Sequence, residues 1–98
     1  MRRTNTQSIG DLLKEFLSEN PYLDTKLAET RLINAWGEVL GQIAMRYTTN
    51  IYVRNKTLHV HISSSVLRGE LMMCREKLIQ TLNEKAGMYV IGDIILLG

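Results

Sequence analysis

The stretch NIYVRNKTLHVHI, residues 50–62, decides the fold, because apolar and polar side chains alternate along most of it. Alternation with a period of two on both sides of Asn55-Lys56 predicts a β-hairpin. One face of this hairpin carries only apolar side chains: Ile51, Val53, Leu58, Val60 and Ile62. Asparagine tolerates the left-handed backbone of a tight turn, but lysine is a weaker choice there than glycine. The sequence therefore leaves open whether the turn has two residues or is a loop of a few.

The segment before the hairpin begins with a predicted amphipathic helix. Ser8, with Asp11 three residues later, resembles a capping box at the start of this helix. Asn20 and Pro21 end it, because proline disfavours helical geometry in the residue that precedes it. Its apolar residues have the spacing of one buried stripe: Ile9, Leu12, Leu13, Phe16 and Leu17.

A second, longer helix is predicted next, with Asp24 or Thr25 as its cap. Its apolar residues again recur at helical spacing: Leu27, Leu32, Ile33, Trp36, Leu40, Ile43 and Tyr47. Gly37 and Gly41 lie in its interior, although glycine costs a helix about 0.5–1 kcal/mol relative to alanine. We expect Trp36 to be a core residue, and the two glycines to let a strand or the third predicted helix pack closely. A small-residue groove for a partner helix is the alternative.

A third helix and a third strand are predicted after the hairpin. Ser63, Ser64 and Ser65 offer caps for the helix, and Gly87 stands where a C-terminal cap would be. The side chains on one face of this helix are Leu67, Leu71, Cys74, Leu78 and Leu82. The closing segment YVIGDIILL, residues 89–97, is apolar on both faces, as in a strand that is buried on both sides.

The element order is therefore α-α-β-β-α-β, which predicts an α+β domain. A hairpin, a crossover helix and a third strand give a three-stranded mixed sheet, with the third strand parallel to the second and the helices packed on one face. At 98 residues and 45% hydrophobic content, the chain supports one core. We expect residues 1–7 to be a flexible tail and residues 8–98 to be a single domain.

The composition excludes several classes of protein. No apolar run approaches the roughly 20 residues that a membrane-spanning helix requires. The first residues, MRRTNTQS, lack the apolar segment of a secretory signal, and a single cysteine fits a reducing compartment, so we expect a cytoplasmic protein. The net charge of +2 permits nucleic-acid binding without arguing for it.

Residues that could carry chemistry do not form a catalytic or metal-binding set in the sequence. His59 and His61 share one face of a strand, but no third ligand lies near them, whereas zinc sites ordinarily supply three or four. Cys74 is expected on the core stripe. No acid, base and nucleophile combination and no glycine-rich phosphate loop can be assembled. We therefore expect a protein that is not an enzyme and needs neither cofactor nor metal.

The elements and particular residues together resemble the DciA-like family of bacterial replicative-helicase loaders and regulators. Trp36, Gly41 and Thr48 are the most specific part of a likeness that runs from about Ile9 to Leu97. It rests on AWGEVLGQIAMRYT (35–48), the hairpin, VLRGEL (66–71), KLIQTLNEKAG (77–87) and VIGDIILL (90–97).

The resemblance implies a domain similar to a type II KH fold and a non-enzymatic role in DNA replication. It implies binding to the replicative helicase and to single- or double-stranded DNA. Two features depart from the pattern. The GxxG loop of KH domains is absent, since GEVLG (37–41) has one residue too many and precedes the hairpin. Larger members also carry a basic extension, of which this chain has almost none.

Cations with aromatic rings between them form the candidate nucleic-acid site, because such surfaces track a phosphate backbone and stack on bases. The candidate residues are Arg46, Tyr52, Arg54, Lys56, His59 and Arg68. Three alternatives stay open. The residues can be an ordinary solvated rim, the domain can be an RNA-binding KH-like module without a helicase role, or the apolar closing strand can form a homodimer through an exposed sheet face.

Overall fold

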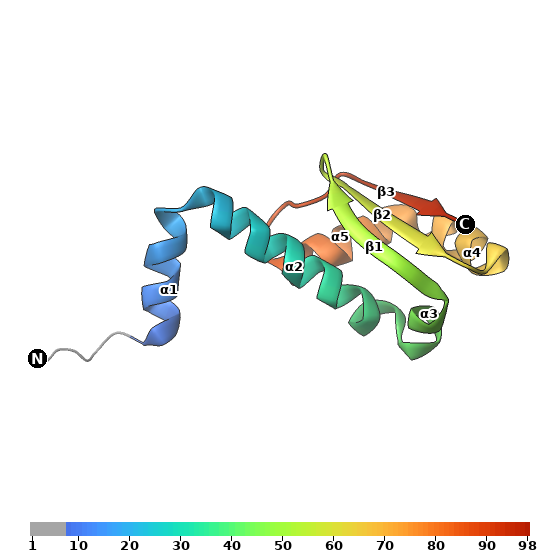
Figure 1. The fold of residues 1–98 in the computed structure, drawn as a ribbon, viewed down its shortest axis with the longest axis horizontal. Coiled ribbons are helices and arrows are strands. Elements are labelled where there is room, and N and C mark those ends of the chain that lie inside the picture. The colour runs from blue at the N-terminus through green and yellow to red at the C-terminus, as the bar shows by residue number, and fades with distance from the viewer. Residues whose placement is uncertain (1–7) are drawn as a thin grey trace, which may run out of the picture.

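The structure is a computed structural model that describes residues 8–98; the predicted tail, residues 1–7, lies outside the described residues. Strands β1 (Thr48–Arg54) and β2 (Thr57–Ile62) are antiparallel, and β3 (Asp93–Leu97) is parallel to β2, in the order β1-β2-β3. This confirms the predicted α+β class and the mixed sheet (Figure 1). The elements are α1 (Ile9–Ser18), α2 (Pro21–Leu40), α3 (Gln42–Tyr47), β1 (Thr48–Arg54), β2 (Thr57–Ile62), α4 (Ser65–Met73), α5 (Arg75–Ala86) and β3 (Asp93–Leu97).

The hairpin turn consists of two residues. Asn55 and Lys56 have φ of 53° and 56°, and Arg54 pairs directly with Thr57. A type I′ turn requires positive φ at both central residues, and its twist matches that of the strands it joins. The shorter of the two predicted turns is therefore the one that forms, with lysine in a position that glycine favours.

The core lies between one face of the sheet and the helices. Leu58, Val60 and Ile62 of β2 are fully buried and pack with Leu32 and Trp36 of α2 and with Leu82 of α5. In Figure 1, α4 and α5 lie behind the strands, so the helices cover one face, as predicted. Burying each such aliphatic side chain contributes about 1.5–3 kcal/mol.

Trp36 is fully buried, as predicted. The N–H of its indole is hydrogen-bonded within the protein. Trp36 Nε1 donates to Thr48 Oγ1 at 3.1 Å, and that hydroxyl donates to the carbonyl of Ala44 at 2.8 Å. The three residues lie on α2, β1 and α3. The hydrogen bonds therefore fix the position of α3 between the long helix and the first strand.

The two glycines have different roles. A Cβ at Gly37 would lie 3.2 Å from the Cγ and Sδ atoms of Met45, so this glycine does allow close packing, although the neighbour is α3 rather than a strand or the third helix. Gly41 has φ of 88° and no atom near an added Cβ. It ends α2 and precedes α3 with a backbone conformation that only glycine adopts at low cost.

The second predicted helix differs from the structure at both ends. It begins at Pro21 rather than at Asp24 or Thr25, because the fixed φ of proline suits the first helical position. It stops at Leu40, and the turn at Gly41 changes the helical phase of residues 42–47. Ile43 and Tyr47 are consequently exposed, while Ala44 faces the core.

The third predicted helix is two helices, α4 and α5. Ser64 caps α4 by accepting a hydrogen bond from the backbone N–H of Leu67, and Gly87 ends α5 in the left-handed conformation, as predicted. Cys74 separates the two helices with φ of −117° and ψ of 24°. It is exposed, so its assignment to the core stripe was wrong. Leu71 and Leu78, on either side of the break, are both buried in the core.

Two apolar segments are less buried than predicted. The stripe on α1 is exposed at Ile9, Leu12, Leu13 and Phe16, because α1 turns away from the end of α2 and does not reach the sheet (Figure 1). In β3, Ile94 is buried, but Ile95 is exposed on the opposite face, so the strand is not buried on both sides. None of the helices in residues 8–98 has the length and apolar character needed to cross a bilayer.

Candidate nucleic-acid interface

The face of the sheet opposite the helices, called here the outer face, carries rings and aliphatic groups. Its central row crosses all three strands, with Tyr52 on β1 beside His59 on β2 and His59 beside Ile95 on β3. The next row contains Asn50, His61 and Leu97. Strand alternation produces this face directly, because the residues between them point into the core.

Two of the predicted site residues are stacked on this outer face. The Tyr52 and His59 rings lie 4.8 Å apart between centroids, with 5° between their planes. His61 lies 6.5 Å from Tyr52 at a tilt of 32°. Cross-strand ring pairs of this kind contribute roughly 0.5–1.5 kcal/mol and limit the rotation of both rings. The pair is therefore a pre-ordered aromatic platform on a helix-free face.

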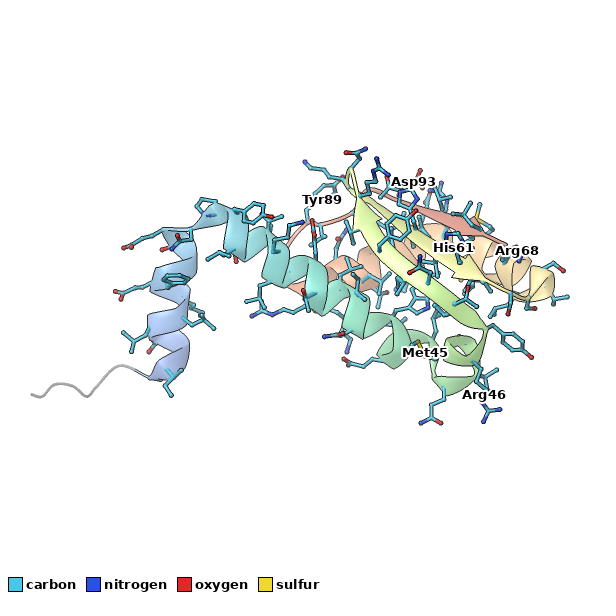
Figure 2. The ribbon with its side chains drawn as sticks, viewed as in Figure 1. Met45, Arg46, His61, Arg68, Tyr89 and Asp93 are labelled. Carbon is cyan, nitrogen blue, oxygen red and sulfur yellow. The ribbon has the colours of Figure 1, made fainter. Side chains whose placement is uncertain are left out.

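Cations lie at the hairpin end of the outer face. Arg54 shares the strand face of Tyr52, and Lys56 is in the turn. The Nζ atom of Lys56 lies 5.6 Å from the ring centroid of Tyr89, within the range of a cation–π interaction. The loop that carries Tyr89 is held to the hairpin by a hydrogen bond of 2.8 Å from the Gly92 N–H to the Lys56 carbonyl. Figure 2 shows Tyr89 at this end of the sheet.

Tyr89, Arg75 and Asp93 were missed in the sequence analysis. Asp93, labelled in Figure 2, begins β3 on the outer face. It forms an ion pair with Arg75, which comes from the first turn of α5. Tyr89 lies in a segment that was interpreted as strand. Its exposure results from the loop before β3, and only the run Gly87 to Gly92 hinted at such a loop. The hairpin end therefore gains one ring and one neutralised charge pair.

Arg46 and Arg68 lie at the other end of the sheet. Arg46 lies in the last turn of α3, next to the start of β1. Arg68 on α4 donates a hydrogen bond to the carbonyl of Ile62, the last residue of β2. The six residues of β2 span roughly 20 Å. The predicted cations therefore do not form one continuous stripe. They lie in two groups with the rings between them, and the guanidinium of Arg68 is already engaged.

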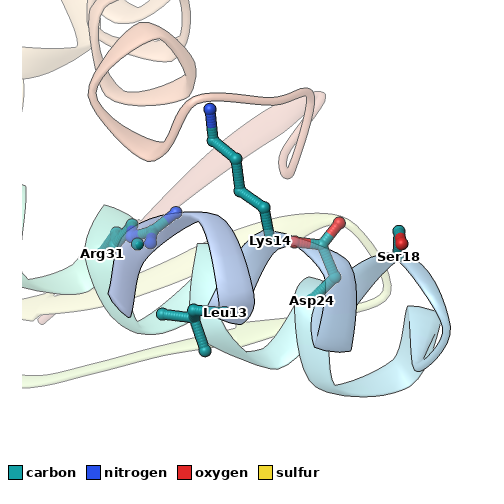
Figure 3. A pocket seen from close by; sticks show the side chains of 6 residues that line it. Leu13, Lys14, Ser18, Asp24 and Arg31 are labelled. Atoms are coloured by element: carbon teal, nitrogen blue, oxygen red, sulfur yellow. The ribbon is translucent and has the colours of Figure 1, made fainter. Parts of the chain in front are cut away.

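The described residues contain no group of three or more His, Cys, Asp or Glu side chains that could hold a metal ion. A hollow of about 430 Å³ lies between α1 and α2 (Figure 3) and is lined by Gly10, Leu13, Lys14, Ser18, Asp24 and Arg31. Another surrounds the junction of α4 and α5 and is lined by Met72, Met73, Cys74, Arg75, Glu76 and Lys77. Ser18 in the first hollow donates to the Glu15 carbonyl, and Cys74 in the second donates to the Glu70 and Leu71 carbonyls, so both hydroxyl and thiol are hydrogen-bonded to main-chain oxygens.

An α+β domain with rings and cations on a helix-free sheet face has the features of a binding module. The chain belongs to the DciA family, because the family model described as "Dna[CI] antecedent, DciA" matches residues 8–96. Membership of this family assigns the protein to replication initiation, as a non-catalytic loader of the replicative helicase. No curated protein and no solved structure matches the chain. The likeness to a type II KH fold stays a prediction.

Proposed function

We propose that this helicase loader binds single-stranded DNA through the outer face of its sheet while it assists the replicative helicase. The stacked pair of Tyr52 and His59 is the observation that carries the proposal. Unpaired bases can stack on such rings, whereas the bases of a duplex are already stacked on one another and present only their edges. A loader acts where the chromosome is replicated, so we also propose a cytoplasmic location.

The charges around the platform support a nucleic-acid ligand. Arg54 and Lys56 are exposed at one end of the rings, and Arg46 is exposed at the other. A single strand that crosses the rings can therefore place its phosphates near cations on both sides. Asp93 is the acidic group on this face, and Arg75 neutralises it. Arg68 is a weaker candidate for a phosphate contact, because its guanidinium is already hydrogen-bonded to the Ile62 carbonyl at the end of β2.

The test is the binding of a fluorescent oligo-dT to wild-type and variant proteins, followed by anisotropy. Removing one stacking ring costs about 1–3 kcal/mol, so Tyr52→Ala and His59→Ala should each weaken binding roughly fivefold to a hundredfold. Tyr22→Ala is the matched control. Tyr22 is exposed on α2, away from the sheet, and Lys26 Nζ lies 5.6 Å above its ring, the same distance as in the Lys56–Tyr89 pair. Equal losses in the control and the platform variants would contradict the proposal.

The salt dependence of binding tests the cations separately. Each phosphate contact to a single strand contributes about 0.7 to the slope of log affinity against log salt. Arg54→Ala/Lys56→Ala should therefore flatten the slope by about 1.4. Lys26→Ala/Arg31→Ala removes the same charge from α2 and should leave the slope unchanged. An oligo-U of the same length shows whether RNA is preferred, which would favour an RNA-binding role.

A second candidate function is self-association through the outer face. Ile95 is exposed there, and Leu97 lies in the neighbouring row. Two copies could cover these groups by packing face to face. Light scattering at tens of micromolar protein distinguishes the candidates: a dimer that Ile95→Glu converts to a monomer, without DNA binding at low salt, supports self-association.

A further inference from the structure

Helix α1 presents apolar side chains that the described chain leaves largely exposed. Ile9, Leu12, Leu13 and Phe16 occupy positions i, i+3, i+4 and i+7, so these four side chains share one face of the helix. The exposed fractions are 85% for Ile9, 50% for Leu12, 45% for Leu13 and 52% for Phe16. Figure 3 shows Leu13 pointing to the opposite side of α1 from Lys14. The helix is thus amphipathic but does not use its apolar side to fold.

Although α1 has only ten residues, it is held as a helix at both ends. The Ser8 hydroxyl accepts a hydrogen bond of 3.1 Å from the N–H of Asp11. At the other end, the Asn20 side-chain amide donates to the Phe16 carbonyl at 2.6 Å, and Pro21 then starts α2. A preformed helix loses less conformational entropy on binding than a disordered segment does. The apolar face is therefore preorganised for binding a partner.

The charge of α1 argues against nucleic acid or a lipid surface as that partner. The segment from Ser8 to Glu19 has three carboxylates, on Asp11, Glu15 and Glu19, and one ammonium, on Lys14, for a net charge of −2. DNA is polyanionic, and helices that lie on anionic membranes are rich in lysine and arginine on the polar side. The complementary surface is an apolar groove with a basic rim on another protein.

The size of the face argues against a second copy of this chain. A helix of ten residues is about 15 Å long, and four apolar side chains offer on the order of 500 Å². A stable interface needs about 800 Å² from each partner. Two α1 helices packed together fall short of this area. A concave groove can surround α1 together with the exposed Tyr22 and Leu23 at the start of α2, which the convex surface of a second α1 cannot do.

We propose that α1 is the element that docks on the replicative helicase, with its apolar face inserted into an apolar, basic-rimmed groove of that partner. This proposal rests on the helicase-loading function of the family. An amphipathic helix in a groove is a recurring mode of protein recognition, and it is read through anchors at i, i+3, i+4 and i+7. The docking helix lies at the far end of α2 from the sheet (Figure 1), so the outer face stays accessible in the complex.

The experiment compares two double variants of the full chain for binding to the cognate helicase by biolayer interferometry. Leu12→Glu/Phe16→Glu places two carboxylates on the apolar face of α1. Val66→Glu/Met73→Glu makes the same change on α4, where the two side chains are 75% and 84% exposed. We expect the α1 variant to bind the helicase about tenfold more weakly or worse, as for an interface hot spot, and the α4 variant to bind like wild type.

Two further measurements make the result decisive. Both variants should keep the melting temperature of wild type to within about 2 °C, because the substituted side chains are exposed. Light scattering should show that wild type is monomeric; a dimer that the α1 variant dissociates would assign α1 to a second copy and overturn the proposal. Equal helicase affinity of the α1 variant and wild type would also overturn it. Failure of wild type to bind the helicase would instead contradict the family-based function.

Discussion

At the scale of single residues, Trp36 holds three elements together. Its indole is fully buried against β2 and α5, and its N–H is satisfied by Thr48, whose hydroxyl in turn reaches Ala44. A buried tryptophan without a hydrogen-bond partner would lose part of the free energy gained by its burial. The threonine at the start of β1 is therefore as much a part of this core site as the aromatic ring.

We predict that Trp36→Ala destabilises the domain by about 3–5 kcal/mol, the cost of deleting a large buried aromatic side chain. A small domain has only about 5–15 kcal/mol of unfolding free energy, so the variant should be partly unfolded or melt far below wild type. Thermal unfolding followed by circular dichroism measures this. Tyr22→Ala, which removes an exposed ring, is the control and should change the melting temperature little. An unchanged melting temperature for Trp36→Ala would show that the ring is not part of the core.

At the scale of elements, the hairpin turn places a lysine where glycine is preferred. Lys56 has φ of 56°, and a side chain in the left-handed region costs roughly 1–2 kcal/mol. The strain is offset by the strand pairing around it. The position of the Lys56 ammonium, next to Tyr89 and the outer face, is thus maintained at a cost in stability.

We predict that Lys56→Gly stabilises the protein by about 1 kcal/mol while it weakens DNA binding. The denaturant midpoint should rise, and the slope of DNA affinity with salt should flatten. Lys56→Ala is the matched control, because it removes the same charge but keeps a side chain at positive φ. A stability gain of equal size in both variants would mean that the backbone conformation is not its origin.

The helices and strands also show how much of the fold could be predicted from the sequence. The hairpin, the parallel third strand and the cap at Gly87 are indicated by local patterns, and all three are present. The breaks at Gly41 and Cys74 were not predicted, because apolar residues continue at helical spacing across both positions. The spacing of apolar residues shows where a helix can form. A one-residue break changes the direction in which the following side chains point, but it leaves the apolar pattern of the sequence unchanged.

The candidate site was predicted in part for a related reason. Tyr52 and His59 were placed together correctly, because strand alternation and hairpin register fix their neighbours. Tyr89 could not be placed, since its position depends on the path of a loop. The exposure of the α1 stripe could not be predicted either, because an amphipathic pattern predicts a buried face without naming the molecule that buries it.

At the scale of the whole molecule, the two proposed binding surfaces lie at opposite ends of the structure (Figure 1). Helix α1 extends from the far end of α2, and the outer face belongs to the sheet. Sites that share no partners and lie far apart usually act additively, within about 0.3–0.5 kcal/mol. The architecture therefore suits a protein that binds a helicase and a strand of DNA at the same time.

We predict that the two surfaces act independently. Tyr52→Ala should bind the helicase as wild type does, and Leu12→Glu/Phe16→Glu should bind oligo-dT as the charge-matched Val66→Glu/Met73→Glu does. Interferometry with helicase and anisotropy with oligo-dT, applied to every variant, measure all four combinations. A variant that loses both ligands while keeping its melting temperature would show that the surfaces are coupled.

The position of the single tryptophan also determines the intrinsic fluorescence of the protein. The indole of Trp36 is buried in the core. Its fluorescence emission maximum should therefore lie at a short wavelength in the folded state and shift to a longer wavelength on unfolding. Neither proposed surface contains a tryptophan. Ligands should therefore leave the tryptophan band in place, while bases stacked on Tyr52 quench tyrosine emission. Folding and binding thus have separate optical signals in one unlabelled molecule.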